Sequence, residues 1–304
     1  MSVDWDSILA LPTLYEAPKP PEPSPQSPLA HLWPFPDKPP MDVQLEALQA
    51  SKGRKGFAFF MRQRLGKTLT AYAEYKNLQK EGEVKWMVII CNNSLKEQWK
   101  EAIEEVDPFE PICIYNSQRK QNLDYFFNAA KKTGGVLIIN RESVKTFMDN
   151  NNWERFDPLS TYLCMDESTG IKNPKLVSTK ACLDLSSICE YKRILTAKPT
   201  GNSNADIWSQ LKFIGATDRN FHQHQFTFTV VGGFKGRKSL YNINEDMLRS
   251  EIAPHCYIAP DKYVKGFKRI YEPLRRIELP KTLSDKYLGI YHDLIVEISD
   301  DIEI

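Results

Sequence analysis

Between about residue 41 and residue 215 the sequence alternates short, continuous apolar runs with longer segments of helical pattern. A strand that is apolar along its whole length is buried on both faces, which is typical of a parallel sheet covered by helices on each side. The alternation therefore predicts an α/β fold with a mainly parallel sheet and helices on both faces. The predicted strands are 57–60, 86–91, 112–115, 136–139, 162–165 and 193–196. The predicted helices are 67–79, 94–105, 119–131, 141–149, 178–187 and 204–214.

The alternation is absent from the first part of the chain. Residues 1–40 contain more than half of the prolines, which excludes a continuous helix or a central strand and predicts an extended arm. Trp5, Ile8, Trp33 and Phe35 are the side chains that would anchor this arm to the folded body.

The segment after residue 215 also departs from the alternation. Residues 226–231 have the composition of a strand, and a basic, glycine-containing loop follows at 232–238. Residues 283–298 show helical periodicity with one apolar face, and that face has no evident partner in the rest of the chain. Its members are Tyr287, Ile290, Tyr291, Leu294 and Ile298.

Composition and charge narrow the class of protein. Hydrophobic residues at 41% and charged residues at 26% are ordinary for a globular domain, and no apolar run reaches the length of a membrane span. The six cysteines show no CxxC spacing, and three lie in predicted strands, which indicates reduced thiols. We therefore expect a cytoplasmic protein without a membrane partner. Because the net charge is only +1, binding of nucleic acid would depend on local basic patches.

The clearest chemical signal is the sequence Gly66-Lys67-Thr68 between a predicted strand and a predicted helix. Gly66 lets the backbone approach a polyphosphate, and the N–H groups at the helix start then face the anion. Lys67 would reach the β- and γ-phosphates, and the Thr68 hydroxyl would bind Mg²⁺. The residues predicted to bind ATP in this segment are Arg64, Leu65, Gly66, Lys67, Thr68 and Leu69.

A second signal is a pair of carboxylates, Asp166 and Glu167, directly after the predicted strand 162–165. Because the carboxyl ends of parallel strands meet at one edge of a sheet, we expect both to lie near Lys67. Asp166 would bind Mg²⁺, and Glu167 would activate the water that attacks the γ-phosphate. Lys67, Asp166 and Glu167 are therefore the predicted catalytic residues of an ATPase that uses ATP and Mg²⁺.

Further segments around these residues follow a known order. They are Pro40-Met41-Asp42-Val43-Gln44, 88–95 with Gln98-Trp99, 138–143, Asp166-Glu167-Ser168-Thr169, 171–175, 179–181, 195–202 and 207–211. In this order and spacing, residues 40–215 resemble the first RecA-like lobe of superfamily 2 helicases, specifically of the Swi/Snf-related double-stranded DNA translocases. The terse motifs and short body favour a phage or bacterial member.

The resemblance implies a RecA-like P-loop NTPase lobe in which Gln44 reads the adenine base. It also implies that DNA, preferably double-stranded, is contacted mainly through its phosphates. The candidate DNA contacts are residues 88–95, Lys172, Lys175 and the loop 235–238. Some positions depart from the family: Arg64 replaces a usual glycine, Met61 replaces a small residue, and Ala197-Lys198 replace the usual Gly-Thr.

A motor of this family hydrolyses ATP between two RecA-like lobes, and the second lobe supplies an arginine finger. No segment here resembles the second lobe, whereas residues 278–287 resemble the linker that leads into it. We therefore expect a second RecA-like lobe, in cis or in trans, as a partner, and poor hydrolysis by this chain alone. The predicted regions are a proline-rich arm at 1–40, an ATP-binding lobe at 41–280 with a variable insertion at 216–272, and the start of the linker helix at 281–304.

Two alternatives to a motor stay open at this point. In the first, the chain is a non-catalytic half-motor that acts as a DNA- or protein-binding adapter; in the second, it is an unrelated P-loop kinase or NTPase. The ordered segments at 171–174 and 195–199 argue against the unrelated NTPase. A zinc site is a separate hypothesis, because His222 and His224 would share one side of a strand. His255 and Cys256 follow them, but the spacing matches no common zinc site and favours ordinary surface histidines.

Overall fold

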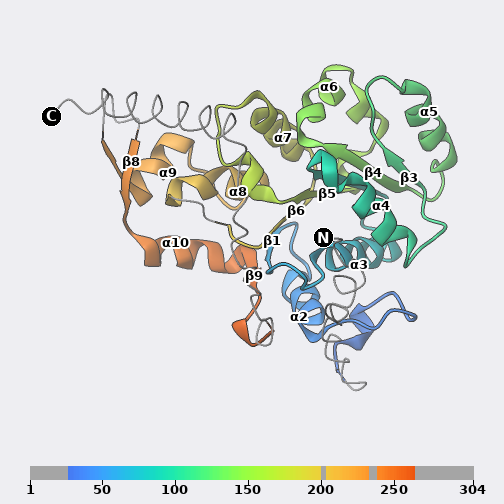
Figure 1. The fold of residues 1–304 in the computed structure, drawn as a ribbon, viewed down its shortest axis with the longest axis horizontal. Helices are drawn as coiled ribbons and strands as arrows, with labels where there is room; N and C mark the ends of the chain where they lie inside the picture. Colours follow the sequence, from blue (N-terminus) through green and yellow to red (C-terminus); the bar gives the residue numbers. More distant parts are fainter. Residues whose placement is uncertain (1–26, 200–202, 233–237, 264–304) are drawn as a thin grey trace, which may run out of the picture. The chain divides into compact units, whose positions relative to one another are not determined.

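A seven-stranded sheet forms the centre of the described chain, with the strand order β3-β4-β2-β5-β6-β1-β9 (Figure 1). The computed structural model describes residues 27–199, 203–232 and 238–263, which fall within one unit, residues 1–264. Every pairing in this sheet is parallel, so the predicted fold class is confirmed. The strands are β1 Gly56–Phe60, β2 Trp86–Cys91, β3 Ile112–Ile114, β4 Gly135–Asn140, β5 Thr161–Asp166, β6 Tyr191–Thr196 and β9 Cys256–Ile258.

Six of these strands match the predicted apolar runs, with ends that differ by at most two residues. The seventh, β9, is three residues long and has no counterpart among the predicted strands. It pairs with the outer side of β1, where Ala58 lies opposite Cys256. The sheet therefore extends past β1, and the loop that follows β1 lies between two other strand ends.

Helices cover both faces of the sheet (Figure 1). Helices α2, α3 and α4 contribute to the hydrophobic cluster on one face, and α5, α6 and α7 contribute to the cluster on the other. Alternate residues of β2 point to opposite faces: Met87 and Ile89 belong to the first cluster, Val88 and Ile90 to the second. The helices are α2 Asp42–Ser51, α3 Lys67–Lys80, α4 Lys96–Glu104, α5 Lys120–Ala129, α6 Val144–Asp149, α7 Val177–Ile188, α8 Trp208–Phe213, α9 Phe221–Phe228 and α10 Glu245–Ile252.

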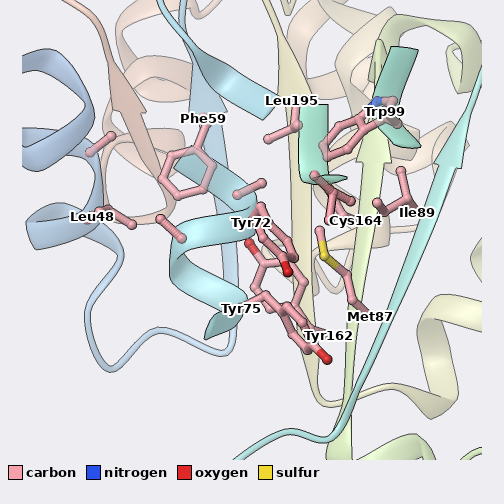
Figure 2. Close-up of a cluster of buried hydrophobic side chains, with 14 of the residues drawn as sticks. Leu48, Phe59, Tyr72, Tyr75, Met87, Ile89, Trp99, Tyr162, Cys164 and Leu195 are labelled. Carbon is pink, nitrogen blue, oxygen red and sulfur yellow. The ribbon is translucent and has the colours of Figure 1, made fainter. Parts of the chain in front are cut away.

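Aromatic side chains fix α3 on the sheet, and Figure 2 shows them together. Tyr72 and Tyr75 of α3 are fully buried and pack with Met87 of β2 and Tyr162 of β5. Burying a large apolar side chain of this kind contributes about 1.5–3 kcal/mol. The hydroxyl of Tyr75 donates to the Lys85 carbonyl oxygen at 3.0 Å, so its polar end is satisfied. Helix α3 is therefore held rigidly against the strands.

A buried ion pair also joins α3 to β6. Arg193 of β6 is 1% exposed and donates to both carboxylate oxygens of Glu74 in α3, at 2.6 and 2.7 Å. The hydroxyl of Tyr162 donates to the same carboxylate at 2.8 Å. The other guanidinium N–H groups donate to the backbone carbonyls of Arg54, Lys55 and Lys192. All five donors of Arg193 are thus bound, which is what a buried guanidinium requires.

The described part of the N-terminal arm packs against the body. Trp33 Nε1 donates to the Lys38 carbonyl oxygen at 2.6 Å, and its ring meets Phe35 edge-on. Phe35 is 6% exposed and stacks on Tyr72, with ring centroids 5.5 Å apart. The predicted anchoring is confirmed for Trp33 and Phe35. Trp5 and Ile8 lie outside the described residues.

The predicted strand at 226–231 is wrong in its first half. Helix α9 continues to Phe228, and a short strand, β7 Thr229–Gly232, follows and pairs antiparallel with β8 Lys238–Asn242. Helix α9 begins with a capping box in which Asn220 and Gln223 bind each other's backbone N–H groups. This capping outweighs the β-propensity of the Phe-Thr repeat. The loop at 233–237 and the predicted helix at 283–298 lie outside the described residues.

Thiol burial agrees with the sequence-based expectation. Five of the six cysteines are buried and free, and Cys256 is half-buried. Burial raises the pKa of the Cys91 thiol to about 12, so it stays protonated and unreactive. Within the part of the chain that the structure describes, no helix combines the length and the apolar character needed to cross a membrane.

Candidate nucleotide site

The loop between β1 and α3 has the backbone shape of a phosphate cradle. Gly66 ends this loop with a φ of +72°, a left-handed conformation that residues with a Cβ rarely adopt. A Cβ at Gly66 would also lie 2.4 Å from Nε2 of Gln44, so the close packing requires glycine. Helix α3 then begins at Lys67. The first N–H groups of a helix have no partner within it, and they attract an anion.

Gln44, which the resemblance assigns to adenine, lies directly behind this loop. It is 3% exposed, and its Nε2 donates to the Gly66 carbonyl oxygen at 3.1 Å. Its Oε1 accepts a hydrogen bond from the backbone N–H of Met41 at 2.8 Å. A carboxamide can donate twice and accept twice, so these bonds leave capacity for a ligand. The adenine contact stays a prediction, and the structure adds a bracing role for Gln44 that the sequence did not indicate.

Lys67 folds back over the loop. Its ammonium donates to the carbonyl oxygen of Met61 at 3.0 Å and to that of Arg62 at 3.4 Å. Burial lowers the pKa of Lys67, while the nearby charges of Glu167 and Asp166 act in the opposite direction. The structure therefore brings the predicted lysine and both predicted carboxylates into one electrostatic site.

The two carboxylates lie at the carboxyl end of β5 in different environments. Burial raises the pKa of Asp166, whereas hydrogen bonds from the Trp99 indole and the Glu167 N–H, together with the Lys67 charge, lower it. Burial and the negative charge of Asp166 raise the pKa of Glu167, and Lys67 lowers it. A carboxylate whose pKa is raised toward neutrality is a stronger base. The arrangement suits a metal-binding Asp166 beside a basic Glu167.

The other predicted residues of the loop differ in what they can offer. Leu65 is 3% exposed and belongs to the core cluster, so only its backbone is available to a nucleotide. Thr68 and Leu69 are half-buried in the first turn of α3, where the unpaired helix N–H groups lie. Their contacts with ATP stay predictions.

The donor set fits the Mg²⁺ that accompanies a nucleotide. Within residues 27–199, 203–232 and 238–263, no cluster of three or more His, Cys, Asp or Glu side chains could hold a metal ion. Mg²⁺ is usually bound by one or two carboxylates together with substrate phosphates and waters, so a full protein cage is not needed. The Asp166 carboxylate and the Thr68 hydroxyl are hard oxygen donors of the required type. They would hold Mg²⁺ jointly with the phosphates of ATP.

Arg64 occupies a position that the family usually gives to glycine, and the backbone shows why. Its φ is +66°, in the same left-handed region as Gly66, and its side chain is exposed. A residue with a Cβ loses about 1–2 kcal/mol in this conformation. Arginine at this position therefore carries a backbone cost, which a contribution of its guanidinium to ATP binding would offset.

Arg64→Gly is expected to raise the free energy of unfolding by about 0.5–1 kcal/mol, because relief of the strain outweighs the greater freedom of an unfolded glycine. Gln63→Gly is the matched control, since Gln63 is an exposed neighbour without a positive φ, and it should be destabilising. Urea denaturation measures both. ATP affinity of Arg64→Gly should fall, and an unchanged affinity would remove Arg64 from the nucleotide site.

The segments expected to contact DNA lie together at the carboxyl edge of the sheet. Lys96, at the start of α4, reaches Oδ1 of Asn140 at the end of β4, at 3.5 Å. Arg141 follows and packs on Gly170 so closely that a Cβ there would lie 1.7 Å from Nη1. Lys172 and Lys175 are exposed beyond this contact. Lys235, Arg237 and the Lys238 side chain lie outside the described part of the chain.

The segment after β6 departs from the family at two positions, but hydrogen bonds still connect it to the segment that carries Asp166 and Glu167. Ser168, the residue after Glu167, donates to Oε1 of Gln210 in α8 at 2.7 Å. The amide nitrogen of Gln210 donates to the Pro199 carbonyl oxygen at 2.6 Å. A continuous hydrogen-bonded path thus joins the segment after β5 to the segment after β6, although Ala197 and Lys198 are unusual there.

The strand geometry on which a zinc set would depend is absent at His222 and His224. His222 and His224 lie on helix α9 and not on a strand, so residues two apart do not share a face. His222 is exposed, whereas His224 is fully buried and its Nε2 lies 3.1 Å from the Asn204 carbonyl oxygen. The expectation of surface histidines is therefore also wrong for His224. It acts as a core residue that packs on Phe228.

Comparison with known proteins gives consistent matches. A family model described as the SNF2-related domain matches residues 63–253. Among curated proteins, the helicase-like transcription factor of Homo sapiens is 31% identical over 138 residues, which cover 43% of this chain and 12% of that protein.

Two solved structures from Sulfolobus solfataricus have a similar fold. One is a SWI2/SNF2 ATPase core in complex with dsDNA, with a TM-score of 0.59 and 19% identity over 76% of this chain and 46% of that chain. The other is a SWI2/SNF2 ATPase core domain, with a TM-score of 0.59 and 18% identity over 81% of this chain and 49% of that chain. The chain thus spans about half the length of these structures.

Proposed function

The chain belongs to the SNF2-related domain family, and on that premise we propose that it is the ATP-binding lobe of a motor that translocates on or unwinds double-stranded DNA. The observation that carries the proposal is the meeting of Lys67 with Asp166 and Glu167 at the carboxyl edge of a parallel sheet. A lysine at a helix start beside two carboxylates is suited to binding and cleaving a polyphosphate.

Each residue then has a distinct task. Lys67 exchanges its contacts with the loop carbonyls for the β- and γ-phosphate oxygens of ATP, and the α3 N–H groups bind the same oxygens. Thr68 and Asp166 would hold Mg²⁺, which would supply positive charge to neutralise these phosphates. Glu167 accepts a proton from the attacking water, for which its raised pKa suits it.

The nucleic acid that we propose as the partner of this chain is double-stranded DNA. One of the similar solved structures is a SWI2/SNF2 ATPase core in complex with dsDNA, and we extend that ligand to this chain as part of the proposal. The support within the chain is the group formed by Lys96, Asn140 and Arg141 with the exposed Lys172 and Lys175. Basic and polar side chains of this kind bind phosphates without reading bases.

The proposal includes a requirement for a second RecA-like lobe, in cis or in trans. An arginine finger from such a lobe contributes on the order of 10³ or more to phosphoryl-transfer rates. Residues 1–304 alone are therefore expected to bind Mg·ATP and to hydrolyse it poorly, even with saturating double-stranded DNA. A coupled phosphate-release assay with and without DNA measures the turnover, and a titration with fluorescent nucleotide measures the binding.

These two measurements separate the parts of the proposal. Fast, DNA-stimulated turnover by residues 1–304 would overturn the requirement for a second lobe. Failure to bind Mg·ATP at millimolar concentration would overturn the nucleotide site itself. Supplying a second lobe and finding no gain in turnover would count against a motor function.

A further inference from the structure

A buried tryptophan contacts the carboxylate that is expected to bind Mg²⁺. The Nε1–H of Trp99 donates to Oδ2 of Asp166 at 2.7 Å. The other carboxylate oxygen, Oδ1, accepts a hydrogen bond from the backbone N–H of Glu167 at 2.9 Å. Each oxygen thus has its own donor, and rotation of the carboxylate would break at least one of the two bonds.

Trp99 itself is held by the core. It is 2% exposed and is among the largest buried side chains of the described chain. Figure 2 shows it near Ile89 and Cys164, at the opposite end of the cluster from Tyr162. In a core packed at this density the indole cannot turn away from Asp166 without opening a cavity. The donor is therefore fixed in place before any ligand arrives.

The position of Trp99 in the chain links Asp166 to the segment that the resemblance places on DNA. Trp99 lies in the first turn of α4, and the short 3-10 turn Asn93–Leu95 immediately precedes this helix. This turn follows β2 at the carboxyl edge of the sheet, in the segment that the resemblance places on DNA. The hydrogen bond thus joins the expected DNA-side segment to the expected Mg²⁺ ligand through one rigid side chain.

We propose that Trp99 is a positioning residue for the Mg²⁺ site, which orients the Asp166 carboxylate through its indole N–H. The inference rests on the proposed function, because it requires that Asp166 binds the Mg²⁺ of a nucleotide complex. Residues that orient a metal ligand through a hydrogen bond typically change metal affinity 10- to 100-fold when they are removed. We expect a change in Mg²⁺ affinity near the lower end of this range, because Trp99 contributes a single, uncharged hydrogen-bond donor.

The test is Trp99→Phe, which keeps an aromatic ring in the core and removes the N–H. Binding of N-methylanthraniloyl-ADP is followed by fluorescence while MgCl₂ is titrated, and the same nucleotide is titrated in EDTA. The Mg²⁺ concentration for half-maximal binding should rise by about tenfold. Affinity in EDTA should stay unchanged, because the phosphate loop is intact.

The matched control is Trp33→Phe. Trp33 also loses an indole hydrogen bond, of 2.6 Å to the Lys38 carbonyl oxygen, but it lies in the N-terminal segment. Its Mg²⁺ dependence should equal that of the unmodified chain. If Trp99→Phe does not fold, as judged by its thermal melt, benzothienylalanine at position 99 replaces the N–H with sulfur and preserves the bicyclic shape.

The possible outcomes are separable. A folded Trp99→Phe chain with unchanged Mg²⁺ dependence would overturn the inference. Equal losses in EDTA and in Mg²⁺ would also overturn it, because they show a general defect of the nucleotide site. If the unmodified chain itself shows no Mg²⁺-dependent nucleotide binding, the proposed function fails and the inference fails with it.

Discussion

Glu74→Ala is expected to lower the free energy of unfolding by about 3–5 kcal/mol, the range found when one partner of a buried ion pair is removed. The substitution leaves the Arg193 guanidinium buried with three backbone acceptors and no counter-charge. It also removes the acceptor of the Tyr162 hydroxyl. Equilibrium urea denaturation, followed by far-UV circular dichroism, measures the loss.

Two further variants test the cause of this loss. The double variant Glu74→Leu/Arg193→Met replaces the pair with apolar side chains and should recover most of the stability, because it leaves no charge in the core. Lys145→Ala breaks an exposed pair with Asp149 within helix α6 and should cost at most about 0.5 kcal/mol. A loss below about 1 kcal/mol for Glu74→Ala would contradict the account of a desolvated, fully bonded pair.

This pair has consequences beyond stability, because it fixes the helix that carries the phosphate loop. Glu74 lies in α3, which begins at Lys67, and Arg193 lies in β6, which leads to Pro199. The ion pair therefore sets the position of α3 relative to β6, the strand that the segment 197–199 follows. Part of the candidate nucleotide site is thus held by a contact in the middle of α3, about two turns of helix away from Lys67.

The sheet could be predicted from the sequence because its strands are apolar along their whole length. Strand β2 shows this most clearly, since all six of its residues are buried and its predicted and observed bounds agree. Strand β9 and helix α2 were not predicted. Helix α2 shows its start only through the bonds between Met41 and Gln44, which depend on a three-residue spacing that is common by chance.

The positions of the candidate catalytic residues could also be predicted, because each has a local signal. Gly66 precedes a helix and Asp166 ends a strand, so their places at the sheet edge follow from the order of elements. The partners of these residues could not be predicted. Gln44 behind Gly66 and Trp99 beside Asp166 are contacts between distant elements, and no spacing in the sequence indicates them.

Backbone conformation was the other missing information. The arginine itself does not indicate a positive φ, although the glycine usual at this position in the family is compatible with one, and the left-handed Arg64 became evident with the structure. Glu167 shows the same effect, with a φ of +46° that turns the chain directly after β5. Such conformations persist where the surrounding structure imposes them, and they are concentrated at functional sites.

Lys67→Ala is expected to weaken binding of Mg·ATP by roughly 10- to 100-fold, since a hydrogen bond to a charged group contributes about 1.5–3 kcal/mol. In this chain the ammonium is half-buried and already poised over the loop, so little reorganisation is needed to reach the phosphates. Titration with fluorescent nucleotide at fixed Mg²⁺ measures the effect. Lys80→Ala, at the exposed end of the same helix, is the control and should bind ATP normally.

The same substitution separates a motor from an adapter. If the chain acts as a motor lobe, Lys67→Ala should abolish DNA-stimulated turnover in the presence of a second lobe while DNA binding persists, because the basic residues at the sheet edge are unchanged. If it acts as a non-catalytic adapter, its cellular role should survive the loss of ATP binding. Normal ATP affinity in Lys67→Ala would contradict the site itself, since the structure places the ammonium beside both Asp166 and Glu167. The motor interpretation thus depends on the Lys67 ammonium, which lies over the loop and in the field of both carboxylates.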